Sequence, residues 1–98
     1  MNDSFEKIAV LAQQFKGLAN DALPIYKAFS EDVLCERLTD IQEIERNLDG
    51  MVSFCFDDRI LLLYKKVLRK LYDQHPETVK SYVDIYYDMF EENGEGDE

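Results

Sequence analysis

Few side chains in this 98-residue chain have the chemistry for catalysis, namely His75, Cys35 and Cys55, and the adjacent carboxylates Asp57 and Asp58. A cysteine nucleophile needs a nearby base, and His75 is the only imidazole that could serve. Nothing in the spacing brings it to either thiol. Adjacent residues on a helix point about 100° apart, so the two aspartates favour helix capping over paired acid–base work. We therefore expect no enzyme activity and no catalytic residues.

A metal or cofactor site is not indicated either. His75 lacks the ExxH or HExxH partner that metal-binding helices use, and Cys35 and Cys55 lie twenty residues apart without a CxxC motif. The glycines do not form a phosphate-binding loop. We expect no cofactor, no metal and no small-molecule substrate. The two cysteines are interpreted as buried, reduced thiols of a cytoplasmic protein.

The charges are unequal and segregated. There are 21 acidic and 11 basic residues, for a net charge of −10. Residues 1–58 have a net charge of −7, residues 59–80 of +4 and residues 81–98 of −7. Excess negative charge opposes binding to nucleic acid or anionic lipid. The basic band is either neutralised by acidic faces of neighbouring helices or directed to an anionic partner.

The longest apolar run, from Asp58 to Asp73, predicts the central helix of the protein. Its apolar positions cover about half of a helical wheel, which requires neighbouring helices on two sides. These positions are Ile60, Leu61, Leu63, Tyr64, Val67, Leu68, Leu71 and Tyr72. The opposite arc is the candidate partner-binding surface, and it contains Arg59, Leu62, Lys65, Lys66, Arg69 and Lys70.

The hydrophobic periodicity along the chain predicts an all-α protein, a small antiparallel bundle of four main helices plus a short extra helix. The length fits one domain, residues 1–92, followed by a disordered acidic tail at 93–98. We expect a first helix at 4–19, with Asp3 and Glu6 as a capping box, and a last helix beginning at Pro76. Between them we expect a short helix near 24–29 and longer helices at 31–49 and about 52–74.

Three of these boundaries are ambiguous. A helix continuous from 22 to 38 would scatter apolar residues all round, which favours a break before Ser30. Thr39 and Gln42 offer a competing helix start at 40. Asp57 as an N-cap would begin the central helix at Asp58 instead of about 52. Asp49-Gly50 has the form of a helix terminator.

The sequence favours a non-catalytic role as a protein-interaction or regulatory module that uses a helical surface, with a protein partner that could be a second copy in a homodimer. The N-terminus does not resemble a targeting segment and no apolar run reaches the roughly 18 residues of a membrane span, which favours a cytoplasmic location and no membrane association. Surplus apolar or amphipathic residues support an interface: Val10, Leu62, Tyr82, Tyr86 and Tyr87.

Two alternatives remain open. Acidic residues could imitate phosphates and occupy a nucleic-acid-binding protein. The basic arc, preceded by Asp49-Gly50, could instead belong to a helix-turn-helix-like DNA binder. The net charge and the lack of base-reading side chains on that arc argue against direct nucleic-acid binding.

Overall fold

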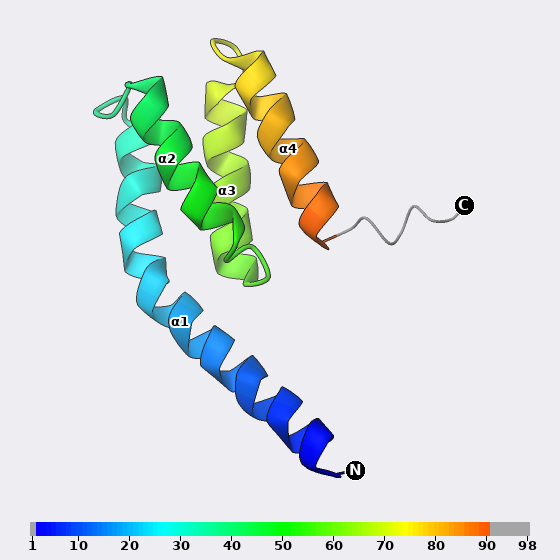
Figure 1. The fold of residues 1–98 in the computed structure, drawn as a ribbon. Coiled ribbons are helices and arrows are strands. Elements are labelled where there is room, and N and C mark those ends of the chain that lie inside the picture. Colours follow the sequence, from blue (N-terminus) through cyan, green and yellow to red (C-terminus); the bar gives the residue numbers. More distant parts are fainter. Residues whose placement is uncertain (1, 91–98) are drawn as a thin grey trace.

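The chain folds into four helices connected by short turns (Figure 1). The computed structural model describes residues 2–90, apart from the side chains of residues 2–6, 8 and 12. The helices are α1 (Asn2–Leu34), α2 (Ile41–Val52), α3 (Asp58–Leu71) and α4 (Pro76–Phe90), and residues 2–90 contain no strand. The predicted all-α bundle is therefore confirmed. The tail predicted at 93–98 lies outside the described residues.

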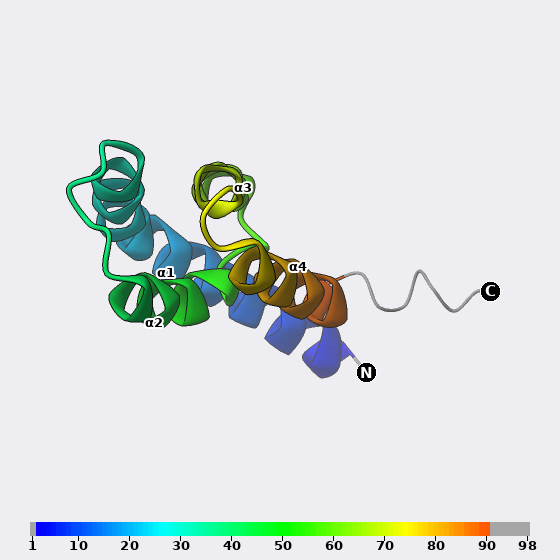
Figure 2. The same ribbon diagram turned by 90° about the horizontal axis from the view of Figure 1, so that it is seen from above.

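The central position of α3 is also confirmed. This helix packs against α1, α2 and α4, and successive helices run in opposite directions (Figure 1). Seen from above, the second half of α1 lies beside α3, while α2 and α4 form the other layer (Figure 2). The buried face of α3 consists of Ile60, Tyr64, Val67, Leu68 and Leu71. Tyr72 is 58% exposed, so its predicted place in the apolar stripe is wrong.

Helix α1 is much longer than predicted because it continues through Pro24. Proline removes one backbone N–H and crowds the carbonyl four residues earlier, and such positions commonly bend a helix. Figure 1 shows α1 changing direction in the stretch before Pro24. The predicted end at residue 19 and the separate short helix at 24–29 are therefore wrong. Burial of one face keeps this second half helical, through Ala19, Ala22, Phe29 and Val33.

The chain turns between α1 and α2, so the predicted helix at 31–49 is wrong and the competing start at 40 is correct. Glu36 adopts a left-handed conformation, with φ of 63°, and the backbone amides of Arg37 and Leu38 both donate to the carbonyl of Asp32. Asp40 caps α2, because its carboxylate accepts from the Gln42 amide at 3.2 Å. A short polar side chain competes well with helical backbone at such a position.

Gly50 does not end α2, as its sequence context had predicted, but lies inside the helix. Its φ is not positive, so conformational freedom is not what the position requires. A Cβ atom at Gly50 would lie 2.7 Å from the hydroxyl oxygen of Tyr26 in α1. Glycine here permits the close approach of two helices.

Asp57 is the N-cap of α3, and its carboxylate accepts from the backbone amide of Arg59 at 2.9 Å. The helix predicted at about 52–74 is therefore wrong, and the competing start at Asp58 is correct. Hydrogen bonds from Arg59 hold the pKa of Asp57 at about 2, below its usual value of 3.8. The turn before it sends Phe54 toward Tyr26, with ring centroids 6.0 Å apart.

The two cysteines occupy different environments. Cys55 is buried, and burial raises its pKa to about 12. Cys35 follows α1 and is exposed, so the prediction of two buried thiols is wrong for this residue.

A buried hydrogen bond connects α3 to α4. The Tyr64 hydroxyl group donates to the backbone carbonyl of Tyr82 at 2.7 Å.

Candidate interaction surfaces

The outer face of α3 combines one exposed leucine with three cations that have no ion-pair partner among the described residues. Leu62 is 54% exposed, and Lys65, Lys66 and Arg69 follow it at helical spacings of three, four and seven residues. Residues at these spacings lie on one side of a helix. Within residues 2–90 the structure gives no ion pair to any of the three cations. We call these four residues the α3 outer face.

The other two predicted partner-binding residues, Arg59 and Lys70, point instead toward α1. Arg59 forms an ion pair with Asp57 at 2.8 Å and also donates to the side chain of Asn20 in α1. Lys70 pairs with Glu36 at 2.7 Å, and its hydrogen bond lowers the pKa of that carboxyl group. Arg59 therefore helps to hold α3 against the middle of α1, and Lys70 holds it against the turn that follows α1, so internal neutralisation accounts for this part of the basic band.

A shallow hollow extends the α3 outer face toward α1. Its volume is about 270 Å³, and it is lined by Leu34, Lys66, Arg69 and Lys70. Leu34, the last residue of α1, is 38% exposed there. Sequence analysis did not identify Leu34 as a surface residue, because it lies within the helix predicted at 31–49, which does not exist as predicted.

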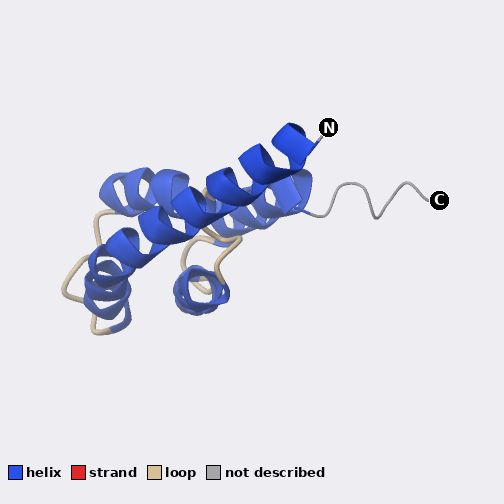
Figure 3. Cartoon of the chain, turned by 90° about the horizontal axis from the view of Figure 1, so that it is seen from below, coloured by secondary structure: helices blue, strands red, loops and turns tan. Residues whose placement is uncertain are grey.

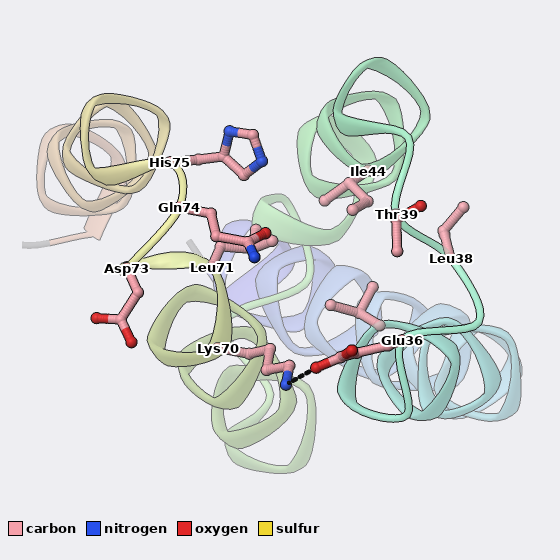
Figure 4. Close-up of a pocket in the computed structure, with 10 residues that line it drawn as sticks. Glu36, Leu38, Thr39, Ile44, Lys70, Leu71, Asp73, Gln74 and His75 are labelled. Carbon is pink, nitrogen blue, oxygen red and sulfur yellow. Dashed lines mark hydrogen bonds and ion pairs between the residues drawn. The ribbon is translucent and has the colours of Figure 1, made fainter.

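A polar hollow of about 280 Å³ lies where the α1–α2 and α3–α4 connections meet (Figure 4). Figure 4 shows His75 and Gln74 directed into it, with the Lys70–Glu36 ion pair at its edge. Neither cysteine lines this hollow, so it does not combine the imidazole with a thiol. Among the described residues, no three His, Cys, Asp or Glu side chains are grouped to hold a metal ion.

The first half of α1 forms a second candidate surface, which we call the α1 arm (residues 2–18). The arm projects past the rest of the bundle (Figures 1 and 3). Leu11, Phe15 and Leu18 are each about half exposed, at 50–52%, and Ala19 is the first buried residue among the described side chains of α1. Their helical spacing places these apolar residues on one face of the helix predicted at 4–19, and the bundle leaves that face half exposed.

The arm meets the body at a pair of phenylalanines. The rings of Phe15 and Phe56 are in edge contact, with centroids 6.2 Å apart, and Phe56 remains 44% exposed. Beside them lies an open hollow of about 600 Å³, lined also by Lys16, Asp57 and Asp58. The apolar surface of the arm thus continues onto the α2–α3 turn.

The tyrosine cluster of α4 is only partly available for contacts. Tyr82 is buried, and its hydroxyl donates to the Asp49 carboxylate at 2.6 Å, so it belongs to the core. Tyr87 is 52% exposed, and its ring contacts that of Tyr86 with centroids 5.5 Å apart. Core packing therefore accounts for part of the tyrosine surplus.

No described helix contains a stretch that is both long and apolar enough to cross a membrane. Comparisons of the chain with protein-family models, with curated proteins and with solved structures gave no significant match.

Proposed function

We propose that this chain is a non-catalytic interaction module in the cytoplasm, and that its α3 outer face binds an acidic surface of a protein partner. The observation behind this proposal is the arrangement of Lys65, Lys66 and Arg69 around Leu62, without ion pairs to the described residues. Elsewhere in the same basic band, Arg59 and Lys70 do have carboxylate partners in the fold. The cations of this band without a partner among the described residues are those that face outward.

The chemistry of this face favours a protein over other partners. Binding energy at protein interfaces is concentrated in a few desolvated residues surrounded by polar ones, and Leu62 within its cationic surroundings has that form. The hollow beside Leu34 adds apolar surface at the same face. Cationic side chains steer an acidic partner and set the salt dependence of binding, while burial of the leucine slows dissociation.

A capture experiment tests this proposal. The immobilised chain is incubated with lysate of its native cells at low and high salt, captured proteins are identified by mass spectrometry, and each candidate is then purified and titrated. Variants Leu62→Glu and Lys66→Glu should weaken binding about tenfold or more. Arg46→Glu makes the same charge change on an exposed cation of α2 and should have little effect.

The results separate the candidate functions. Salt-sensitive binding of a purified acidic protein, lost in Leu62→Glu and retained in Arg46→Glu, would support the proposal. Equal binding by all variants would refute it. Capture of a basic nucleic-acid-binding protein through the acidic helices would favour mimicry of a nucleic acid, and tight binding of a labelled DNA duplex would favour the DNA-binding alternative.

A further inference from the structure

The apolar stripe of α1 follows the spacing of a coiled-coil seam. Leu11, Phe15, Leu18, Ala22 and Ile25 are separated alternately by four and three residues. This alternation is the a/d pattern of helices that pair along their length. Packing inside the bundle buries Ala22, yet Ile25 is 64% exposed, so the exposed stripe continues past the bend of the helix.

The side chains that the structure describes in the α1 arm are exposed, and apart from the contact of Phe15 with Phe56 they lack the tertiary packing that normally stabilises a helix of this length. At about 1.5 Å per residue its 17 residues span about 25 Å. Isolated helices of this size are marginal in water, and most helical stability in proteins comes from packing of an apolar face. Every residue from 13 to 18 is exposed. A helix laid along the stripe would supply the missing contacts.

We infer that the occupant is the α1 arm of a second copy of this chain, paired antiparallel about a two-fold axis near residue 13. In this register Leu11 of each copy lies opposite Phe15 of the other, and Leu18 lies opposite position 8, which is Ile8 in the sequence. Positions 8 and 15 are then a positions, positions 11 and 18 are d positions, and each of these pairs places an a position opposite a d position. A two-fold interface uses one patch on both partners, and this stripe is complementary to itself in that register.

The charges flanking the stripe support this occupant. Lys7 and Asp21 occupy equivalent flanking positions two heptads apart, and both are exposed without an ion pair to the described residues. Antiparallel pairing brings Lys7 of each copy beside Asp21 of the other, and Gln14 falls near the axis. Two complementary charge pairs therefore form in the antiparallel register. In a parallel in-register pair, equivalent flanking positions lie on opposite sides of the seam, so these two pairs do not form.

The exposed area is also sufficient. Leu11, Phe15, Leu18 and Phe56 are each between 44% and 52% exposed. Covering about 100 Å² on each of them in both copies would bury about 800 Å² from these side chains alone, and the flanking residues of the seam bring the total toward the lower range for a specific interface, about 1,000 Å². This interface leaves the α3 outer face free, so the inference does not depend on the proposed function.

The test is sedimentation velocity of the full chain over a range of concentrations. We expect a concentration-dependent dimer whose dissociation constant rises about tenfold or more in Leu11→Glu. Val10→Glu is the matched control, because Val10 is 53% exposed on the same arm but about 100° away from Leu11. Circular dichroism checks that each variant keeps its helices. A wild-type chain that remains monomeric, or equal weakening by Val10→Glu, would overturn the inference.

The antiparallel register has its own test. Lys7→Glu and Asp21→Lys should each weaken the dimer, and the double variant should restore it, because the charge pairs are then reversed instead of broken. In a Cys35→Ser background, Lys7→Cys combined with Asp21→Cys should form an intermolecular disulfide between positions 7 and 21. Failure of the double variant to restore the dimer, or disulfides joining position 7 to position 7, would refute the register.

Discussion

Gly50 in α2 lies directly beneath the hydroxyl group of Tyr26 in α1, so close that a Cβ atom would come within 2.7 Å of the hydroxyl oxygen. The contact joins two helices that the chain separates by a turn, and it explains why a residue of low helix propensity lies inside α2. The tyrosine ring also packs against Phe54, which limits how far it can move aside.

Gly50→Ala should therefore destabilise the protein by about 1–3 kcal/mol, because the overpacking outweighs the better helix propensity of alanine. In a Tyr26→Phe background, which removes the obstructing hydroxyl, the same substitution should instead stabilise by about 0.5–1 kcal/mol. Urea denaturation of the four proteins measures this coupling. Additive effects of the two substitutions would show that the contact does not constrain the fold.

Gly17→Ala should have the opposite effect in the α1 arm, because, apart from the adjacent backbone of its own helix, no described atom lies within 4 Å of a Cβ at this position. Better helix propensity alone is worth up to about 1 kcal/mol, so amide hydrogen exchange in the arm should slow about fivefold. Ala9→Gly, at another exposed arm position, should accelerate exchange by a similar factor. No change in either variant would mean that propensity does not limit the stability of the arm.

Asp57→Ala should destabilise the protein by about 1–2 kcal/mol, because it removes the N-cap of the central helix. Asp57→Asn should cost less at neutral pH, since asparagine also caps helices. The pKa of Asp57 falls from 3.8 to about 2 on folding. Its charge therefore contributes stability above pH 3.8, and this contribution is lost as the pH falls through 2.

Denaturation curves of wild type and Asp57→Asn between pH 7 and pH 2 test this dependence. The difference in unfolding free energy between the two proteins should shrink as the pH falls. A difference that stays constant over this range would show that the Asp57 charge is not stabilised by Arg59 in the folded state.

The two thiols should react at very different rates with an aromatic disulfide reagent at pH 8. Cys35 is exposed and should react quickly, whereas Cys55 is buried with its pKa raised to about 12 and should react only on unfolding. Cys35→Ser should abolish the fast phase, and adding denaturant should release the second thiol. Fast reaction of Cys55 in the folded variant would contradict its burial.

Local sequence patterns were sufficient to predict where a helix begins when its first residues include a strong capping residue or proline. Pro76 begins α4 as its fixed φ and missing N–H predict, and both Asp40 and Asp57 cap helices where competing starts had been identified. The apolar face of α3 was read correctly except at its last residue, Tyr72. The residues of the α3 outer face could also be predicted from sequence, because helical periodicity alone separates Leu62 and the neighbouring cations from the core.

Only the tertiary structure decided how far α1 extends and which of its residues are covered. The penalty of Pro24 is local, whereas the packing that offsets it comes from residues distant in sequence, so a propensity argument breaks the helix where the fold does not. In the same way, periodicity groups Leu11, Phe15 and Leu18 on one face but cannot say whether another helix covers that face. This face remains exposed because α1 is long and its direction carries the arm beyond the bundle. The length and direction of α1 depend on contacts made by the whole chain.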